Sequence, residues 1–195
     1  GQSIVQYQLS TGAQPGVVIN GATGSSLFGS SVGPAKAREI LQGKSTTSLA
    51  GLDYSTVTER SMGAAATLNS LFTQSLSAAI PAPPVYTNPI SGLTETNSLA
   101  VQLQTVAKAI ASQRTTGVKR QVFFVSLGGW DTHDFQNSAQ SNNLSKVAAA
   151  MAYFDGALSS IGGVDMRPNV TTFTASDFSR TFTTNGDGTD HAWGG

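Results

Sequence analysis

The stretch VFFVSLGGWDTHDFQ, residues 122–136, begins as an apolar run and ends in two glycines, a tryptophan, two aspartates and a histidine. The run RQVFFVSL, residues 120–127, has the pattern of a strand covered on both faces. Apolar side chains then step by three and four over residues 139–161, which predicts a helix. The β-branched run NVTTFTA, residues 169–175, predicts another strand. This order predicts a βαβ unit with parallel strands and a right-handed crossover.

The chain before this unit is predicted to contain loops and two helices. Residues 1–55 are rich in Gly, Ser and Thr and read as loops with short extended pieces. Apolar side chains on one face predict a helix over 56–80, which the prolines that follow should stop. A second helix is predicted over 97–114, with Thr96 or Asn97 as its N-cap. We therefore expect one α/β domain over residues 1–195: a loop-rich part (1–55), a helical part (56–119) and the βαβ unit (120–195).

The composition excludes several classes of function. Charged residues make up 11% of the 195 residues, and the 11 acidic and 11 basic side chains balance. Without a basic face to neutralise phosphates, nucleic acid is not an expected partner. The absence of cysteine excludes a disulfide framework and a thiolate metal site. No apolar run approaches the roughly 18 residues of a membrane span.

Seven of the eight aspartates and both histidines lie from Asp131 onward, and both histidines stand near or beside aspartates. In a parallel sheet, ligands bind beyond the carboxyl ends of the strands. Asp131 and His133 follow the first predicted strand and Asp177 follows the second. The segment that carries Asp190 and His191 can fold back to the same edge. These five residues are a candidate site for one or two divalent metal ions, with zinc, manganese, iron, magnesium or calcium as candidates.

Other readings of the same residues remain open. Asp177 and Asp190 could be a turn cap and a helix cap, and an Asp-x-His pair can simply be hydrogen-bonded within a loop. Arg180 could bind an anionic ester group or form a structural ion pair. The segment NGDGTDH resembles the start of a calcium loop but lacks the glycine at its sixth position. Ser126 follows a predicted strand without the GxSxG pattern of a serine hydrolase.

The segment VFFVSLGGWDTHDFQ, the helix after it and NVTTFTASDFSRTFTTNGDGTDHAWGG together resemble the fifteen-hundred-and-first domain of unknown function, a bacterial family. This family is placed in the alkaline phosphatase and sulfatase superfamily. The resemblance implies a three-layer α/β/α sandwich with a mostly parallel sheet, incomplete in this chain. It implies that Asp131, His133 and His191 belong to a first metal site and Asp177 to a second. Phe178 stands where the superfamily has a second-site histidine, and residues 1–55 contain no recognisable nucleophile.

Two functions are therefore expected as alternatives. The first is an exported, metal-dependent hydrolase of small phosphate or sulfate esters, or its catalytically inactive descendant, in the periplasm or outside the cell. The second is an extracytoplasmic structural or interaction subunit on the same fold. The predicted helices carry more apolar surface than two strands can cover. We therefore expect exposed apolar surface, covered by further chain, a second fragment or self-association.

Overall fold

The computed structural model describes residues 48–74, 77 and 79–193. The chain divides into two compact units, Gly1–Thr73 and Gln74–Gly195. In the first unit, helix α2 covers Leu49–Phe72. The helix predicted over 56–80 coincides with α2 over residues 56–72, but α2 begins earlier and ends before the prolines. A proline sets the last position at which a helix can continue, and the helix can end sooner. The loop-rich reading of 1–55 falls mostly outside the described residues.

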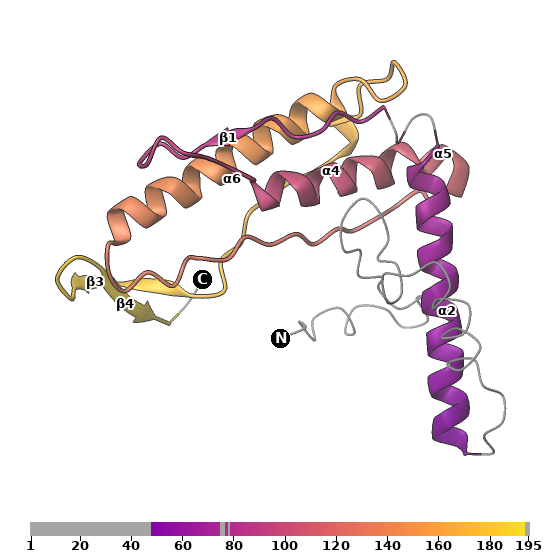
Figure 1. The fold of residues 1–195 in the computed structure, drawn as a ribbon, viewed down its shortest axis with the longest axis horizontal. Coiled ribbons are helices and arrows are strands. Elements are labelled where there is room, and N and C mark those ends of the chain that lie inside the picture. Colours follow the sequence, from indigo (N-terminus) through magenta and orange to yellow (C-terminus); the bar gives the residue numbers. More distant parts are fainter. Residues whose placement is uncertain (1–47, 75–76, 78, 194–195) are drawn as a thin grey trace. The chain divides into compact units, whose positions relative to one another are not determined.

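The second unit combines helices with two short hairpins. Strands β1 and β2 pair antiparallel, and so do β3 and β4. Figure 1 shows α4 and α6 side by side, with β3 and β4 close to the end of α6 where that helix begins. The elements are β1 (Tyr86–Thr87), β2 (Thr94–Glu95), α4 (Ser98–Ala111), α5 (Gln113–Thr116), α6 (Gln136–Leu158), the 3-10 turn η3 (Arg167–Asn169), β3 (Ser179–Thr184) and β4 (Thr189–Ala192).

Helix α4 follows the sequence prediction closely. The side chain of Asn97 accepts a hydrogen bond from the Ala100 N–H, so Asn97 is the N-cap. This bond satisfies one of the amides that the first turn leaves without an intrahelical partner. The same side chain donates to the Lys146 carbonyl at 2.7 Å and thereby ties α4 to α6. The predicted stripe is buried: Leu99, Leu103, Val106 and Ile110.

Helices α4 and α6 bury the hydrophobic core of the second unit. Ala107 and Ala150 are completely buried, which allows the two helices to approach closely. The prediction for α6 holds for Phe154 and Leu158, which are buried. It is wrong for Leu144 and Met151, which are 58% and 38% exposed. The core cluster is Ile80, Leu99, Ala100, Leu103, Val106, Ala107, Ile110, Ala111, Ala150, Phe154, Ala157, Leu158 and Ile161.

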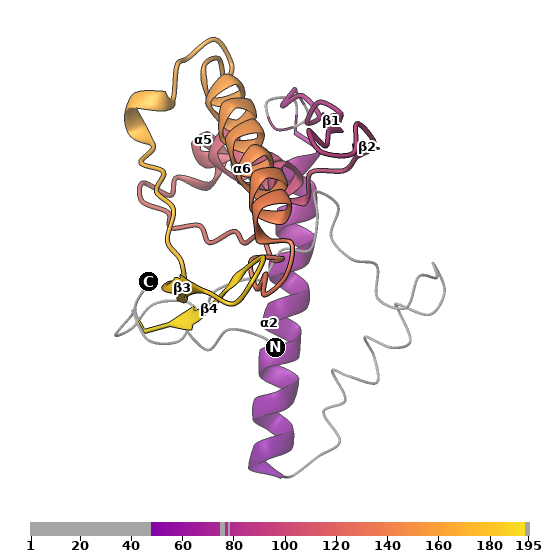
Figure 2. The same ribbon diagram turned by 90° about the vertical axis from the view of Figure 1, so that its left-hand side faces the viewer.

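The expected three-layer sandwich with a mostly parallel sheet is wrong. In the part of the chain that the structure describes, the only sheets are two antiparallel pairs of strands. Both predicted strands, 120–127 and 169–175, lack a hydrogen-bonded ladder and are drawn as plain coil in Figure 2. At Ser126 the side-chain amide of Gln102 takes the place of a neighbouring strand. It accepts from the Ser126 N–H at 3.0 Å and donates to the Ser126 carbonyl at 2.8 Å.

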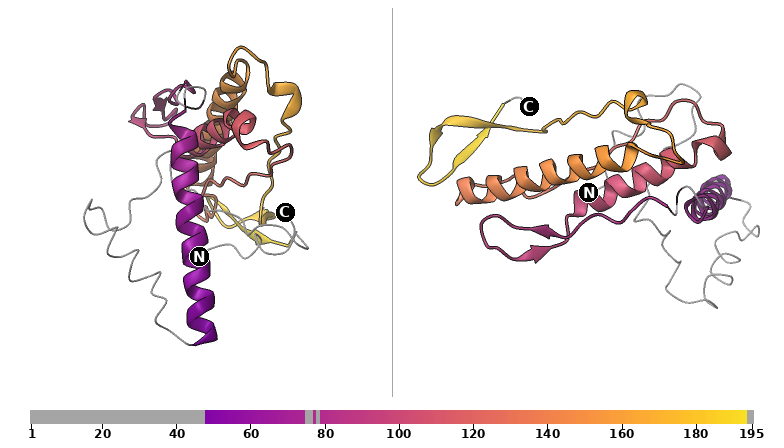
Figure 3. Two further views of the ribbon diagram at one scale, coloured as in Figure 1. Left: turned by 90° about the vertical axis from the view of Figure 1, so that its right-hand side faces the viewer. Right: turned by 90° about the horizontal axis from the view of Figure 1, so that it is seen from above.

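These unpaired segments expose apolar side chains, as expected. Val125 and Leu127 pack against the core, whereas Val122 is 99% and Phe124 75% exposed. Phe173 in the second segment is also exposed. Seen from above in Figure 3, α4 and α6 lie between the β1–β2 and β3–β4 hairpins. Among the described residues, no helix is both long and apolar enough to cross a membrane.

Candidate metal centre

The loop that joins the first extended segment to α6, residues 128–135, is called the DxH loop. Asn143, buried in α6, donates from Nδ2 to the Gly129 carbonyl at 2.6 Å. Gly129 has φ +88°, a conformation that a side chain would strain. Thr132, three residues after Gly129, is buried, and its N–H donates to the Trp130 carbonyl. Helix α6 therefore fixes the turn from which Asp131 and His133 project.

The DxH loop ends in a strained residue. Phe135 has φ +50° and precedes α6 without a side-chain capping bond. Left-handed conformations of bulky residues cost on the order of 1–3 kcal/mol and gather at functional sites. The peptide that follows is held from outside the helix, because the Gln136 N–H donates to the Asp187 carbonyl at 3.1 Å. The C-terminal hairpin thus stabilises the start of α6.

The C-terminal hairpin, β3–β4, packs its turn against the DxH loop. The side chain of Asn185 donates to the His133 carbonyl at 3.2 Å and accepts from the Gly188 N–H at 3.1 Å. Gly188 lies so close to the His133 carbonyl that a Cβ atom would overlap it. Thr189 donates from its hydroxyl to Gln136 Oε1 at 2.7 Å. These contacts bring β4 alongside the loop.

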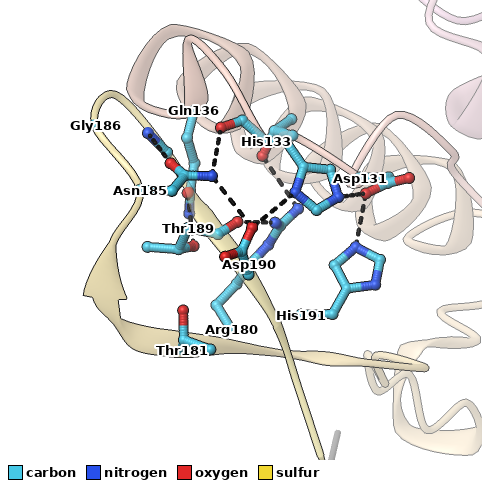
Figure 4. Close-up of polar contacts among 12 residues, drawn as sticks. Asp131, His133, Gln136, Arg180, Thr181, Asn185, Gly186, Thr189, Asp190 and His191 are labelled. Carbon is cyan, nitrogen blue, oxygen red and sulfur yellow. Dashed lines mark hydrogen bonds and ion pairs between the residues drawn. The ribbon is translucent and has the colours of Figure 1, made fainter.

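Three predicted ligands meet where the loop and the hairpin touch. Asp131 Oδ1 lies 2.9 Å from His133 Nε2 and 2.6 Å from His191 Nε2. One ligand atom from each of these residues lies within 4.8 Å of the other two. Figure 4 shows both imidazoles turned toward the Asp131 carboxylate. We call Asp131, His133 and His191 the metal cluster.

Asp190 contacts the cluster from behind His133. Its Oδ1 lies 3.3 Å from His133 Nδ1, the ring nitrogen that points away from Asp131. Asn185 donates to the same oxygen at 3.2 Å. A carboxylate at the second nitrogen of a ligating histidine orients the ring and leaves the first nitrogen for the metal. Asp190 therefore has the position of an orienting group.

The charges around Asp131 favour its ionised form. The hydrogen bond from His191 lowers the pKa of the Asp131 carboxyl below its ordinary value, against a smaller opposing effect of desolvation. The charges of His191, His133 and Arg180 act in the same direction as the hydrogen bond. The carboxylate is thus kept in the form that a cation needs. Its side chain is 65% exposed, so solvent reaches the cluster.

Two rings stack on the imidazole of His191. Its ring stacks on His133 with centroids 4.9 Å apart and on Phe178 with centroids 4.2 Å apart. Phe178 immediately precedes β3, at the position where the resemblance would place a second-site histidine. In this fold its ring serves as a packing surface for His191. Stacking restricts the ring to a plane that points Nε2 at Asp131.

The remaining predicted residues lie in different places. Asp177 is exposed in the bend before β3, and the cluster found among the described residues does not include it. Arg180 is half-buried beneath the cluster and paired with His191 in the hairpin register. Sequence reasoning missed Asn143, Asn185 and Gly188, which hold the site together. No signal in the sequence singles out Asn143, because the first half of α6 is polar almost throughout.

The metal cluster suits a transition metal. Two imidazole nitrogens and one carboxylate oxygen form a donor set used by catalytic zinc and by non-haem iron. Zinc–ligand bonds of about 2.0 Å place neighbouring ligand atoms about 3.3 Å apart. The observed 2.6 and 2.9 Å separations are those of hydrogen bonds. A cation would need to widen these two separations by only about half an ångström, and the two imidazole nitrogens lie within 4.8 Å of each other.

Comparison with known proteins identifies the family. The family model described as "Protein of unknown function (DUF1501)" matches residues 50–195, and the chain belongs to this family. The family identified from the sequence is therefore confirmed, and its placement in the alkaline phosphatase and sulfatase superfamily stays a prediction. The matched range includes the DxH loop, α6 and the C-terminal hairpin. No curated protein and no solved structure matches the chain.

Proposed function

We propose that this member of the family binds one divalent transition-metal cation, zinc in the first place, through Asp131, His133 and His191. The observation that carries the proposal is the convergence of three ligand atoms from two segments about 60 residues apart in the sequence. Two nitrogen donors disfavour magnesium and calcium, which prefer sites made of oxygen. Asp190 would hold the Nδ1 proton of His133 and so present Nε2 to the cation.

We propose hydrolysis of a small phosphate or sulfate ester as the activity of this centre. Three protein ligands leave a coordination position open, the arrangement that distinguishes catalytic from structural zinc. A bound cation would supply Lewis acidity toward an ester oxygen and lower the pKa of a water molecule. The side chains of His133 and His191 are 48% and 44% exposed, so a substrate can reach the cluster.

An interaction role is the second candidate. The unpaired segment 120–127 exposes Val122 and Phe124, and residue Phe173 adds a third large apolar side chain. Exposed apolar groups on backbone without a ladder favour association with another chain. Multi-angle light scattering of the protein and of a Val122→Ser/Phe124→Ser variant would test this role. A monomer in both cases would count against it.

The metal test uses the intact chain and a matched pair of variants. Zinc, cobalt and manganese are titrated into chelator-treated protein, and bound metal is measured by mass spectrometry. We expect one zinc per chain. His133→Ala should weaken binding at least about 10–100-fold, since even losses outside the ligand shell reach that range. Asp134→Asn, an exposed neighbour outside the cluster, serves as the control and should bind normally. Equal affinities for both variants would reject the site.

The activity test follows from the metal test. The zinc-loaded protein is assayed with aryl phosphates and aryl sulfates, and a chelator should abolish turnover. Asp177→Ala tests whether zinc is bound by the metal cluster alone or by the cluster together with Asp177. It should retain zinc if the cluster alone forms the site, and lose zinc if Asp177 is a ligand. A zinc-loaded protein that turns over neither ester would leave metal binding intact and refute the hydrolase.

A further inference from the structure

Arg180 connects the two segments that form the metal cluster. It lies on β3 directly opposite His191. From there its guanidinium group reaches both the DxH loop and β4. Nη2 donates to the Trp130 carbonyl and lies 3.3 Å from Thr132 Oγ1. Nη1 donates to the Thr189 carbonyl at 2.6 Å.

The anchors of this guanidinium stand next to cluster residues in the sequence. Trp130 and Thr132 flank Asp131 on either side, so Nη2 holds the segment that carries the carboxylate through one backbone carbonyl and one side-chain hydroxyl. Thr189 precedes the Asp190–His191 pair, so the bond from Nη1 fixes the backbone of β4. A planar fork that holds both segments sets the separation between them.

The guanidinium is also held from the side. Its central carbon lies 4.9 Å from the centroid of Phe178, the ring that stacks on His191. The nitrogens that would face an anion are directed at carbonyl oxygens and a hydroxyl. An arginine with these contacts holds the neighbouring segments in place.

We infer that Arg180 is the positioning residue that sets the distance between Asp131 and His191, and that an anionic substrate does not bind to it. The inference deepens the proposed function, because the two ligands it positions belong to the metal cluster. A lysine would place one point charge where the fork makes contacts with both segments. A positive charge alone at position 180 should therefore not hold Asp131 and His191 at the observed distance.

The contacts at the hairpin turn make the expected effect local. Without help from Arg180, Asn185 attaches the turn to the DxH loop, and Asp187 and Thr189 attach it to Gln136 at the start of α6. Loss of the fork should let the end of β4 that carries His191 move away from Asp131. The contact between His133 and Asp190 should persist, because it lies nearer the turn.

The first experiment examines the metal cluster by NMR in the metal-free protein. The chain has two histidines, so the ring nitrogens give two sets of NMR signals. In Arg180→Lys the His191 Nε2 signal should lose the shift of a hydrogen-bonded nitrogen, while the His133 signals keep theirs. Arg114→Lys, in α5, is the matched control and should change neither ring. Unchanged His191 signals in Arg180→Lys would overturn the inference.

The second experiment measures zinc affinity in the same three proteins. Arg180→Lys should bind zinc about 10–100-fold more weakly, the usual cost of losing a group that supports a ligand. An intact His191 signal together with weaker binding of inorganic phosphate would identify Arg180 as an anion-binding group and refute its positioning role. If the unaltered protein binds no zinc, the proposed function fails, and the histidine signals still decide the role of Arg180.

A measurement on the unaltered protein covers the case in which the variant does not fold. The η protons of Arg180 are followed by NMR. Three bonds to the protein should slow rotation about the guanidinium C–N bonds and slow exchange of these protons with water. Free rotation, equal to that of Arg114, would overturn the inference.

Discussion

Different kinds of interaction stabilise the α4–α6 core and the C-terminal hairpin. In the core, Ala107 and Ala150 are completely buried, and Phe154 is 4% exposed. At the hairpin, the cluster side chains remain about half exposed, and the contacts are hydrogen bonds from Arg180, Asn185 and Thr189. Burial is non-directional and roughly proportional to area, whereas hydrogen bonds require geometry.

This difference predicts a division of labour within the second unit. The core should determine the free energy of unfolding, and the hairpin should determine the distances between ligand atoms. Regions held by exposed hydrogen bonds open locally at a lower free energy than the core. A cation bound to the folded form alone would stabilise the hairpin by about 2.7 kcal/mol at a hundred times its dissociation constant.

The largest effect is expected from Phe154→Ala, because Phe154 lies in the centre of the core. Truncation of a buried phenylalanine costs about 3–5 kcal/mol from lost transfer energy and the cavity left behind. Urea titration should show this loss in the free energy of unfolding. Phe182→Ala, on β3, is the control, since its ring is fully exposed and the change should stay within about 0.5 kcal/mol. Equal losses would mean that the core does not dominate stability.

Gly188→Ala should affect the hairpin more than the core. The new Cβ would overlap the His133 carbonyl, and that carbonyl belongs to backbone, so the hairpin must shift. Overpacking of this kind costs about 1–3 kcal/mol. We expect zinc binding to be lost while the helical circular dichroism is retained. Gly156→Ala in α6 has open space around its Cβ position and should leave the site unchanged. Normal zinc binding by Gly188→Ala would contradict the docked geometry.

The helices could be predicted because local signals agree with their packing. Asn97 is both a favoured capping residue and the observed cap, and the stripe after it repeats with the period of a helix. The strands could not be predicted in the same way. The apolar run at 120–127 fits a buried strand, but a strand also needs a partner backbone along at least one edge. At Ser126 the side-chain amide of Gln102 takes the place of the partner backbone, and no sequence pattern predicts this contact.

The candidate site was partly visible in the sequence for chemical reasons. The two histidines and Asp131 are scarce groups in a chain with little charge, and they do converge. Asp177 and Asp190 have the same chemical character, yet the first is exposed outside the cluster and the second contacts a ring nitrogen. Their places depend on the β3–β4 register and on Asn185, which are properties of the fold.

The smallest effect concerns a third attachment, where the β1–β2 hairpin meets α6. Lys146 Nζ lies 3.1 Å from the Glu95 carboxylate. The hydrogen bond from Lys146 lowers the pKa of the Glu95 carboxyl below its ordinary value, against a smaller opposing effect of desolvation. The charge of Lys146 and the hydrogen bonds from Asn142 and Asn88 also lower this pKa. A lowered folded pKa contributes stability that is present above the unfolded value and lost as pH falls through the folded value.

Glu95→Gln should therefore be less stable than the unaltered protein at pH 7, and the difference should shrink as the pH falls below about 4.5. Carboxyls such as Asp131 titrate in both proteins and cancel in the comparison. Urea titrations at pH 7 and at low pH measure the two differences. High salt should reduce the pH 7 difference, because the pair is partly exposed and salt screens exposed charges. A difference that stays constant across this pH range would show that the attachment does not depend on the charge of Glu95.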